Sequence, residues 1–199
     1  MATTAEKVRE LRDKTGAGVM DCKEALAASG EDLEQAVDFL RKKGLAAASK
    51  RAHREARDGV VSSYIHAGAK LGVLIEVNCE TDFVARTEQF QDLVKGLAMQ
   101  VAAASPQWVS RDQVPAAVIE REREIYRQQM ADQKKPPPVL EKIIEGKLAK
   151  FFEDSCLVDQ PYIRDASGKL RVGDLVAQVS AQTGEKIAVR RFVRFQVGE

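Results

Sequence analysis

The stretch Leu71-Gly72-Val73-Leu74-Ile75-Glu76-Val77-Asn78-Cys79 is the part of the chain that decides its fold class. Apolar side chains occupy every odd-numbered position, an alternation typical of a β-strand with one buried face. Residues 60–66 form a second extended run, and the turn-forming tripeptide Ala67-Gly68-Ala69 separates the two runs. The pattern therefore predicts a β-hairpin in the middle of the chain.

The residues before this hairpin have helical spacing instead. Capping residues, apolar positions three or four apart and glycine stops indicate three short helices. We therefore expect a three-helix domain in residues 1–43, a basic helical linker in 44–58 and a separate core in 59–199. The residues that carry these signals are Thr3, Glu6 and Gly16 for the first helix, Asp21, Glu24 and Gly30 for the second, and Leu33, Leu40 and Gly44 for the third.

The residues after the hairpin alternate between helical and extended patterns. Prolines 136–138 interrupt the helical pattern, because proline lacks an amide donor and clashes inside a helix. Extended segments separated by helices indicate an α+β core, with helices packed on a largely antiparallel sheet. The expected elements are helices at 90–101, 116–133, 140–155 and 172–182, and strands at 162–164 and 187–197.

Composition excludes several classes of protein. The 31 Lys and Arg against 30 Asp and Glu give a formal net charge of +1, so no global field attracts nucleic acid or an acidic membrane. Three scattered cysteines and two histidines argue against a disulfide scaffold and a zinc module. The N-terminus has no apolar signal core, and no segment approaches the ~20 apolar residues of a membrane span. We expect a cytoplasmic protein that does not contact membranes.

Catalytic motifs are also absent from the sequence. Neither His53 nor His66 lies beside a serine or cysteine, and no GxSxG, HExxH or GxGxxG is present. We expect no enzymatic activity, no metal and no cofactor, although a site that converges only in three dimensions stays open at this point.

The most informative segment follows the predicted second strand of the hairpin. Here Glu80-Thr81-Asp82-Phe83-Val84 places acids and an aromatic between a strand and a helix. In one interpretation Thr81 or Asp82 caps the helix and Phe83 anchors the core. In the other, a loop on a rigid support presents a carboxylate and an aromatic to a partner. The residue types fit both interpretations.

Two further segments are candidate binding sites. The loop from Thr15 to Asp21 contains glycines but lacks the Gly-Lys-Ser/Thr ending of a phosphate-binding loop. Its Val19 and Met20 fit either a partner contact or a packing role in which Met20 covers the following helix. Residues 41–57 contain seven Lys or Arg, but no aromatic residue alternates with them, so a solvated helical face is favoured over RNA binding.

Two segments of this chain closely resemble the signatures of the elongation factor Ts family. They are LRDKTGAGVMDCKEAL at residues 11–26 and EVNCETDFVAR at residues 76–86. With residues 54–59 and 191–195, the likeness covers essentially the whole chain in order. The resemblance implies a ubiquitin-associated-like three-helix domain joined to the α+β core.

The resemblance also implies a function. Members of this family bind the GTPase elongation factor Tu in its GDP form, disturb its magnesium and phosphate site, promote GDP release, and are displaced after GTP binds. The contact with the nucleotide domain would fall on Thr81, Asp82, Phe83 and Val84, with Phe83 as a wedge, and an auxiliary contact on Val19 and Met20. No cofactor is implied.

This chain departs from longer family members, which carry a second core subdomain and a projecting helical hairpin. It resembles the short form, in which two copies form a homodimer that serves two GTPase molecules, and the last strand is a candidate for the dimer surface. The rival interpretations are a ubiquitin-associated-like adaptor for another protein and an RNA-binding accessory protein. We expect no direct nucleic-acid binding.

Overall fold

The computed structural model describes residues 4–130 and 136–199, so the expected capping residue Thr3 and part of the expected helix at 116–133 lie outside the described residues. The helices are α1 (Thr4–Thr15), α2 (Val19–Ala28), α3 (Leu33–Arg51), α4 (Asp82–Ala85), α5 (Glu88–Ala104), α6 (Ala116–Gln129), α7 (Pro137–Ser155) and α8 (Val172–Thr183). The strands are β1 (Asp58–Ile65), β2 (Leu71–Cys79) and β3 (Ala188–Gln196), and short 3-10 turns span Arg111–Gln113 and Leu157–Asp159.

The chain divides into two compact units. The first consists of the chain up to residue 60 together with residues 77–93 and 174–188. The second consists of residues 61–76, the described part of 94–173, and residues 189–199.

Three N-terminal helices share one small apolar core, as the spacing predicts. Gly16 ends α1 in the left-handed region at φ 64°, and Asp32 caps α3 by accepting from the amide of Gln35 at 2.8 Å. Helix α2 begins at Val19, two residues before the expected start at Asp21. The buried members of the core are Val8, Leu11, Cys22, Ala25, Leu26 and Ala36.

Helix α3 differs from the prediction at its C-terminal end. The expected stop at Gly44 is wrong, because α3 continues to Arg51. A glycine inside a helix costs only about 1 kcal/mol relative to alanine, and the alanine-rich residues 46–48 favour continuation. Gly44 is buried, and a Cβ built there would lie 3.6 Å from the Cβ of Ala181 in α8. The small residue therefore allows close packing against α8.

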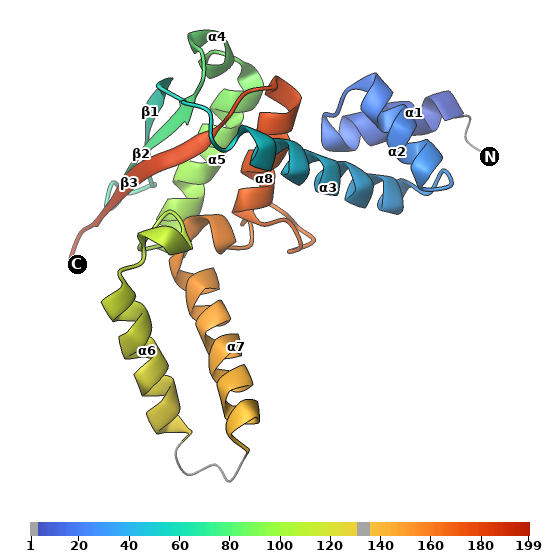
Figure 1. The fold of residues 1–199 in the computed structure, drawn as a ribbon. Helices are drawn as coiled ribbons and strands as arrows, with labels where there is room; N and C mark the ends of the chain where they lie inside the picture. Colours follow the sequence, from blue (N-terminus) through green and yellow to red (C-terminus); the bar gives the residue numbers. More distant parts are fainter. Residues whose placement is uncertain (1–3, 131–135) are drawn as a thin grey trace. The chain divides into compact units, whose positions relative to one another are not determined.

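The three strands form one antiparallel sheet in the order β1-β2-β3 (Figure 1). The amide of His66 donates to the Leu71 carbonyl at 2.9 Å, which closes the hairpin that the alternation predicted. The odd-numbered side chains of β2 from Val73 to Cys79 are buried. In the second unit, the C-terminal part of α5 adds buried side chains such as Val94 and Leu97. The predicted α+β class is confirmed.

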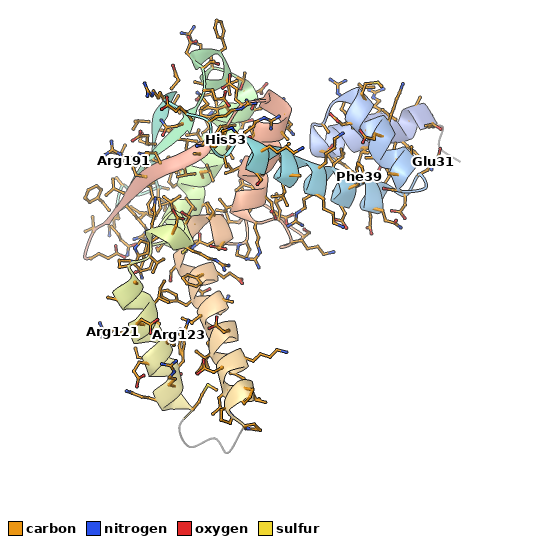
Figure 2. The ribbon with its side chains drawn as sticks, in the orientation of Figure 1. Glu31, Phe39, His53, Arg121, Arg123 and Arg191 are labelled. Atoms are coloured by element: carbon orange, nitrogen blue, oxygen red, sulfur yellow. The ribbon has the colours of Figure 1, made fainter. Side chains whose placement is uncertain are left out.

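Helices α6 and α7 form a hairpin within the second unit (Figure 1). Buried Met130, Ile144 and Leu148 form its apolar seam. Arg123 lies on the side of α6 that faces α7 (Figure 2), and its Nη1 is 3.2 Å from the Glu145 carboxylate. The resemblance associated a projecting helical hairpin with longer family members only. This chain nevertheless builds a helical hairpin, from α6 and α7.

The expected strand at residues 162–164 is also wrong. These residues form a turn, and only Pro161 makes an isolated bridge, to Arg171. The Asp165 carboxylate accepts from the amides of Ser167, Lys169 and Leu170 at 3.2, 2.9 and 2.7 Å. A side chain that captures successive amides favours a turn over a strand ladder.

Candidate partner-binding site

The segment after β2 forms the single-turn helix α4. Thr81 is its N-cap, and its hydroxyl accepts from the amide of Val84 at 3.5 Å. Val84 and Ala85 are buried, whereas the Phe83 side chain is 78% exposed. The capping interpretation of Thr81 is thus confirmed, and the interpretation of Phe83 as a core anchor is wrong. An exposed phenylalanine held between a cap and buried neighbours is available to a partner.

Asp82 occupies the first turn of α4 beside Phe83. Its carboxylate is 2.7 Å from Nη2 of Arg86, one helical turn later. The Arg86 side chain is largely exposed and that of Asp82 is partly exposed, so the pair is screened by water and contributes little to stability. The surface of α4 therefore presents an aromatic ring with a carboxylate and a guanidinium next to it.

The backbone that leads into α4 is held by two carboxylates. Glu185 accepts from the amides of Glu80 and Thr81 at 3.0 and 3.1 Å, and from the Thr81 hydroxyl at 2.6 Å. Glu80 in turn accepts from the amide of Lys186 at 2.6 Å. That amide, assisted by the Arg54 guanidinium, lowers the pKa of the Glu80 carboxyl below its usual 4.5. The Glu80 carboxylate is consequently charged at neutral pH.

Cys79 lies beneath this loop and is fully buried. Its thiol donates to the Thr81 carbonyl at 3.1 Å. Burial, together with the negative charges of Glu185 and Asp58, raises the pKa of the Cys79 thiol to about 11. Such a thiol stays protonated at neutral pH and is a poor nucleophile, so it supports the loop rather than supplying chemistry.

Val19 and Met20 begin α2, in the same compact unit as α4. Gly18 precedes them as an N-cap without a side-chain hydrogen bond. Met20 is 74% exposed and Val19 is 43% exposed. The interpretation in which Met20 covers the following helix is therefore not what the structure shows, and both apolar side chains face solvent.

The basic segment 41–57 is partly neutralised within its own unit. Five of its seven Lys and Arg side chains contact acceptors there, four of them with carboxylates, which reduces the charge left for phosphate groups. The contacts are Arg41 with Asp174, Lys43 with Asp21 and Glu24, Arg51 with the Ser180 carbonyl, Arg54 with Glu80, and Arg57 with Glu55.

Comparison with known proteins identifies the family. The family model described as elongation factor TS matches residues 5–199. This chain belongs to the elongation factor Ts family. It is 56% identical over 199 residues to elongation factor Ts of Thermodesulfovibrio yellowstonii, covering 100% of this chain and 98% of the relative. It is 53% identical over 199 residues to elongation factor Ts of Fervidobacterium nodosum, covering 100% of both chains. It is 58% identical over 195 residues to that of Anaeromyxobacter sp. (strain Fw109-5), covering 98% and 88%.

Family membership gives the protein a role in translation elongation. Within the described ranges 4–130 and 136–199, no three His, Cys, Asp or Glu side chains gather in a way that could hold a metal ion. Over the same ranges, no helix is long and apolar enough to cross a membrane.

Sequence reasoning missed the support of α4, which comes from Glu185 and Lys186. These residues are 104 to 106 positions away from the backbone and side-chain groups that they hold. Their only local signal is a charged pair after Gly184, in the turn between α8 and β3. Such a pair is common in surface turns, so nothing nearby in the sequence marked it.

Proposed function

We propose that this protein is the guanine-nucleotide exchange factor of the GTPase elongation factor Tu. The single observation that carries the proposal is Phe83, which is 78% exposed on a helix whose backbone is fixed by charged hydrogen bonds. A rigidly held exposed aromatic is the kind of group that fills a partner's pocket at an energetic hot spot. Family membership supplies the partner.

The proposed mechanism needs no bond-making by this protein. Phe83 enters the nucleotide domain of elongation factor Tu near its magnesium and phosphate site, with Thr81, Asp82 and Val84 beside it. The bound state disfavours magnesium and GDP, and because coupling between two ligands is reciprocal, GDP weakens the binding of this protein by the same factor. GTP then binds and this protein is displaced. The protein acts without a cofactor and is not an enzyme in its own right.

A second contact accompanies the first in this proposal. Val19 and Met20 at the exposed start of α2 bind the same GTPase and add affinity. The N-terminal helices thus hold the partner while α4 acts on its nucleotide site. This exchange takes place in the cytoplasm, with the rest of translation.

We further propose that two copies form a homodimer through the outer face of the sheet and bind two GTPase molecules. The Val197 amide donates to the Lys70 carbonyl at 2.8 Å, and Arg191 pairs with Glu76 at 2.6 Å. This register places exposed apolar side chains of all three strands on one face. A monomer rarely leaves such a face to water. Its exposed members are Val61, Ile65, Leu74, Val193, Phe195 and Val197.

Release of a fluorescent GDP analogue tests the exchange function. Elongation factor Tu loaded with the analogue is mixed with excess unlabelled GDP, with and without a substoichiometric amount of this protein. Multiple-turnover acceleration supports the proposal. An unchanged release rate at saturating protein would refute it.

A further inference from the structure

Helix α4 cannot fix its own orientation. It contains four residues, and a single helical turn forms too few hydrogen bonds to be stable alone. The direction in which Phe83 leaves the surface therefore depends on contacts with the surrounding structure. The buried side chains of Val84 and Ala85 anchor one side of the turn, and at its C-terminal end Nε2 of Gln91 donates to the Ala85 carbonyl at 2.6 Å.

At the N-terminal end, one side chain takes all the donors that lead into the turn. Oε2 of Glu185 accepts from the amides of Glu80 and Thr81, and its Oε1 accepts from the hydroxyl of Thr81. Hydrogen bonds to a charged acceptor are stronger than neutral ones and impose direction. Three of them on two consecutive residues leave the start of α4 little freedom.

Lys186, the neighbour of Glu185, holds the chain that leaves α3. The ammonium group of Lys186 donates to the carbonyls of Ala52 and Arg54 at 2.7 and 2.8 Å. The Lys186 amide donates to Glu80, to which the Arg54 guanidinium is also bound at 3.3 Å. Residues 185 and 186 therefore connect α4 to the exit of the N-terminal helices, within one compact unit.

We infer that Glu185 is a positioning residue for nucleotide exchange, one that acts through the backbone of residues 80 and 81 to set the orientation of Phe83. This inference rests on the proposed function of Phe83. Glu185 itself is only partly exposed, and both of its oxygens are occupied by this loop. It supports the contact surface rather than forming it.

The test compares three substitutions of Glu185 in the full chain. Glu185→Gln keeps the length and one oxygen able to accept both amides, while its amide group faces the Thr81 hydroxyl, which can accept. Glu185→Asp keeps the charge but is one methylene too short. Glu185→Ala removes the carboxylate and all three hydrogen bonds that it accepts. We expect Glu185→Gln to exchange GDP within about threefold of wild type, and the other two to lose on the order of tenfold, because they no longer make the hydrogen bonds to residues 80 and 81.

The matched control is Asp165→Ala in the other compact unit. Asp165 accepts from three backbone amides in a turn, as Glu185 accepts from two amides and a hydroxyl, so each substitution removes three hydrogen bonds to backbone or side-chain donors. We expect it to exchange at the wild-type rate. In the Phe83→Ala background, Glu185→Ala is expected to change the rate of GDP exchange by less than about twofold, because the effects of two residues that act through one contact are not additive.

Amide hydrogen exchange on the free protein provides a readout independent of elongation factor Tu. The amides of Glu80 and Thr81 are expected to exchange faster in Glu185→Ala and Glu185→Asp than in wild type. If the wild-type protein does not accelerate GDP release but these amides exchange faster in the variants, the proposed function fails, while the role of Glu185 in holding residues 80 and 81 is supported. Normal GDP exchange by Glu185→Asp with faster amide exchange would overturn the positioning role. So would a Glu185→Gln variant that is defective while Glu185→Asp is normal, since charge rather than geometry would then matter.

Discussion

Phe83→Ala separates an exposed wedge from a structural aromatic. Because the Phe83 ring is 78% exposed, its removal uncovers little buried surface. The free energy of unfolding is then expected to change by less than about 0.5 kcal/mol. Phe90, which is fully buried in α5, is the matched control. Its truncation is expected to cost about 3 to 5 kcal/mol. In a chain of this length each kcal/mol lowers the melting temperature by roughly 2 to 4 °C.

The effect of Phe83→Ala on exchange is expected to be large. Truncating an aromatic that fills a partner's pocket costs on the order of 2 kcal/mol or more, which is roughly thirtyfold in affinity or rate. Thermal unfolding and fluorescent GDP release are measured on the same preparations of wild type, Phe83→Ala and Phe90→Ala. A Phe83→Ala protein that melts with wild type and still exchanges at the wild-type rate would show that the ring is not the wedge.

Three further predictions concern the neighbouring features. Asp82→Ala is expected to slow exchange less than Phe83→Ala, because its carboxylate is partly exposed and screened; a larger loss in the GDP-release assay would contradict this. Phe195→Glu, on the outer sheet face, is expected to convert the dimer into a 21.9 kDa monomer in sedimentation; a wild-type protein that is already monomeric at micromolar concentration would refute the dimer. Because its pKa is lowered in the folded state, Glu80 stabilises the fold above pH 4.5, and this contribution disappears as the pH falls through the folded pKa. The stability difference between wild type and Glu80→Gln, measured by denaturant unfolding, is therefore expected to shrink between pH 7 and pH 3, and a constant difference would contradict it.

The pattern of apolar, capping and turn residues predicted those elements that depend on interactions between residues close in sequence. The hairpin followed from the alternation in residues 71–79, and the N-terminal helices followed from apolar spacing and glycine stops. The end of α3 could not be predicted, because Gly44 acts there as a close-packing residue against Ala181, and that contact is distant in sequence. The expected strand at 162–164 was wrong because the Asp165 side chain competes with a strand ladder for amide donors.

At the candidate site too, the features set by nearby residues could be predicted and those set by distant residues could not. Thr81 could be predicted as a cap, since capping depends on residues three positions apart. Whether Phe83 faces the core or the solvent could not be predicted, because a buried and an exposed aromatic have the same neighbours in the sequence. The resemblance made the last strand a candidate for the dimer surface, but the sequence did not indicate that Phe195 would be exposed.

The central claim is that this protein and GDP weaken each other's binding to elongation factor Tu. The most direct measurement is a pair of titrations of nucleotide-free and GDP-loaded elongation factor Tu with this protein, together with GDP titrations in its presence and absence. We expect GDP to lower the affinity of this protein for elongation factor Tu by at least about fivefold, and this protein to lower the affinity of GDP by the same factor. An affinity for elongation factor Tu that saturating GDP leaves unchanged would show that the two ligands are not coupled and would refute the exchange mechanism.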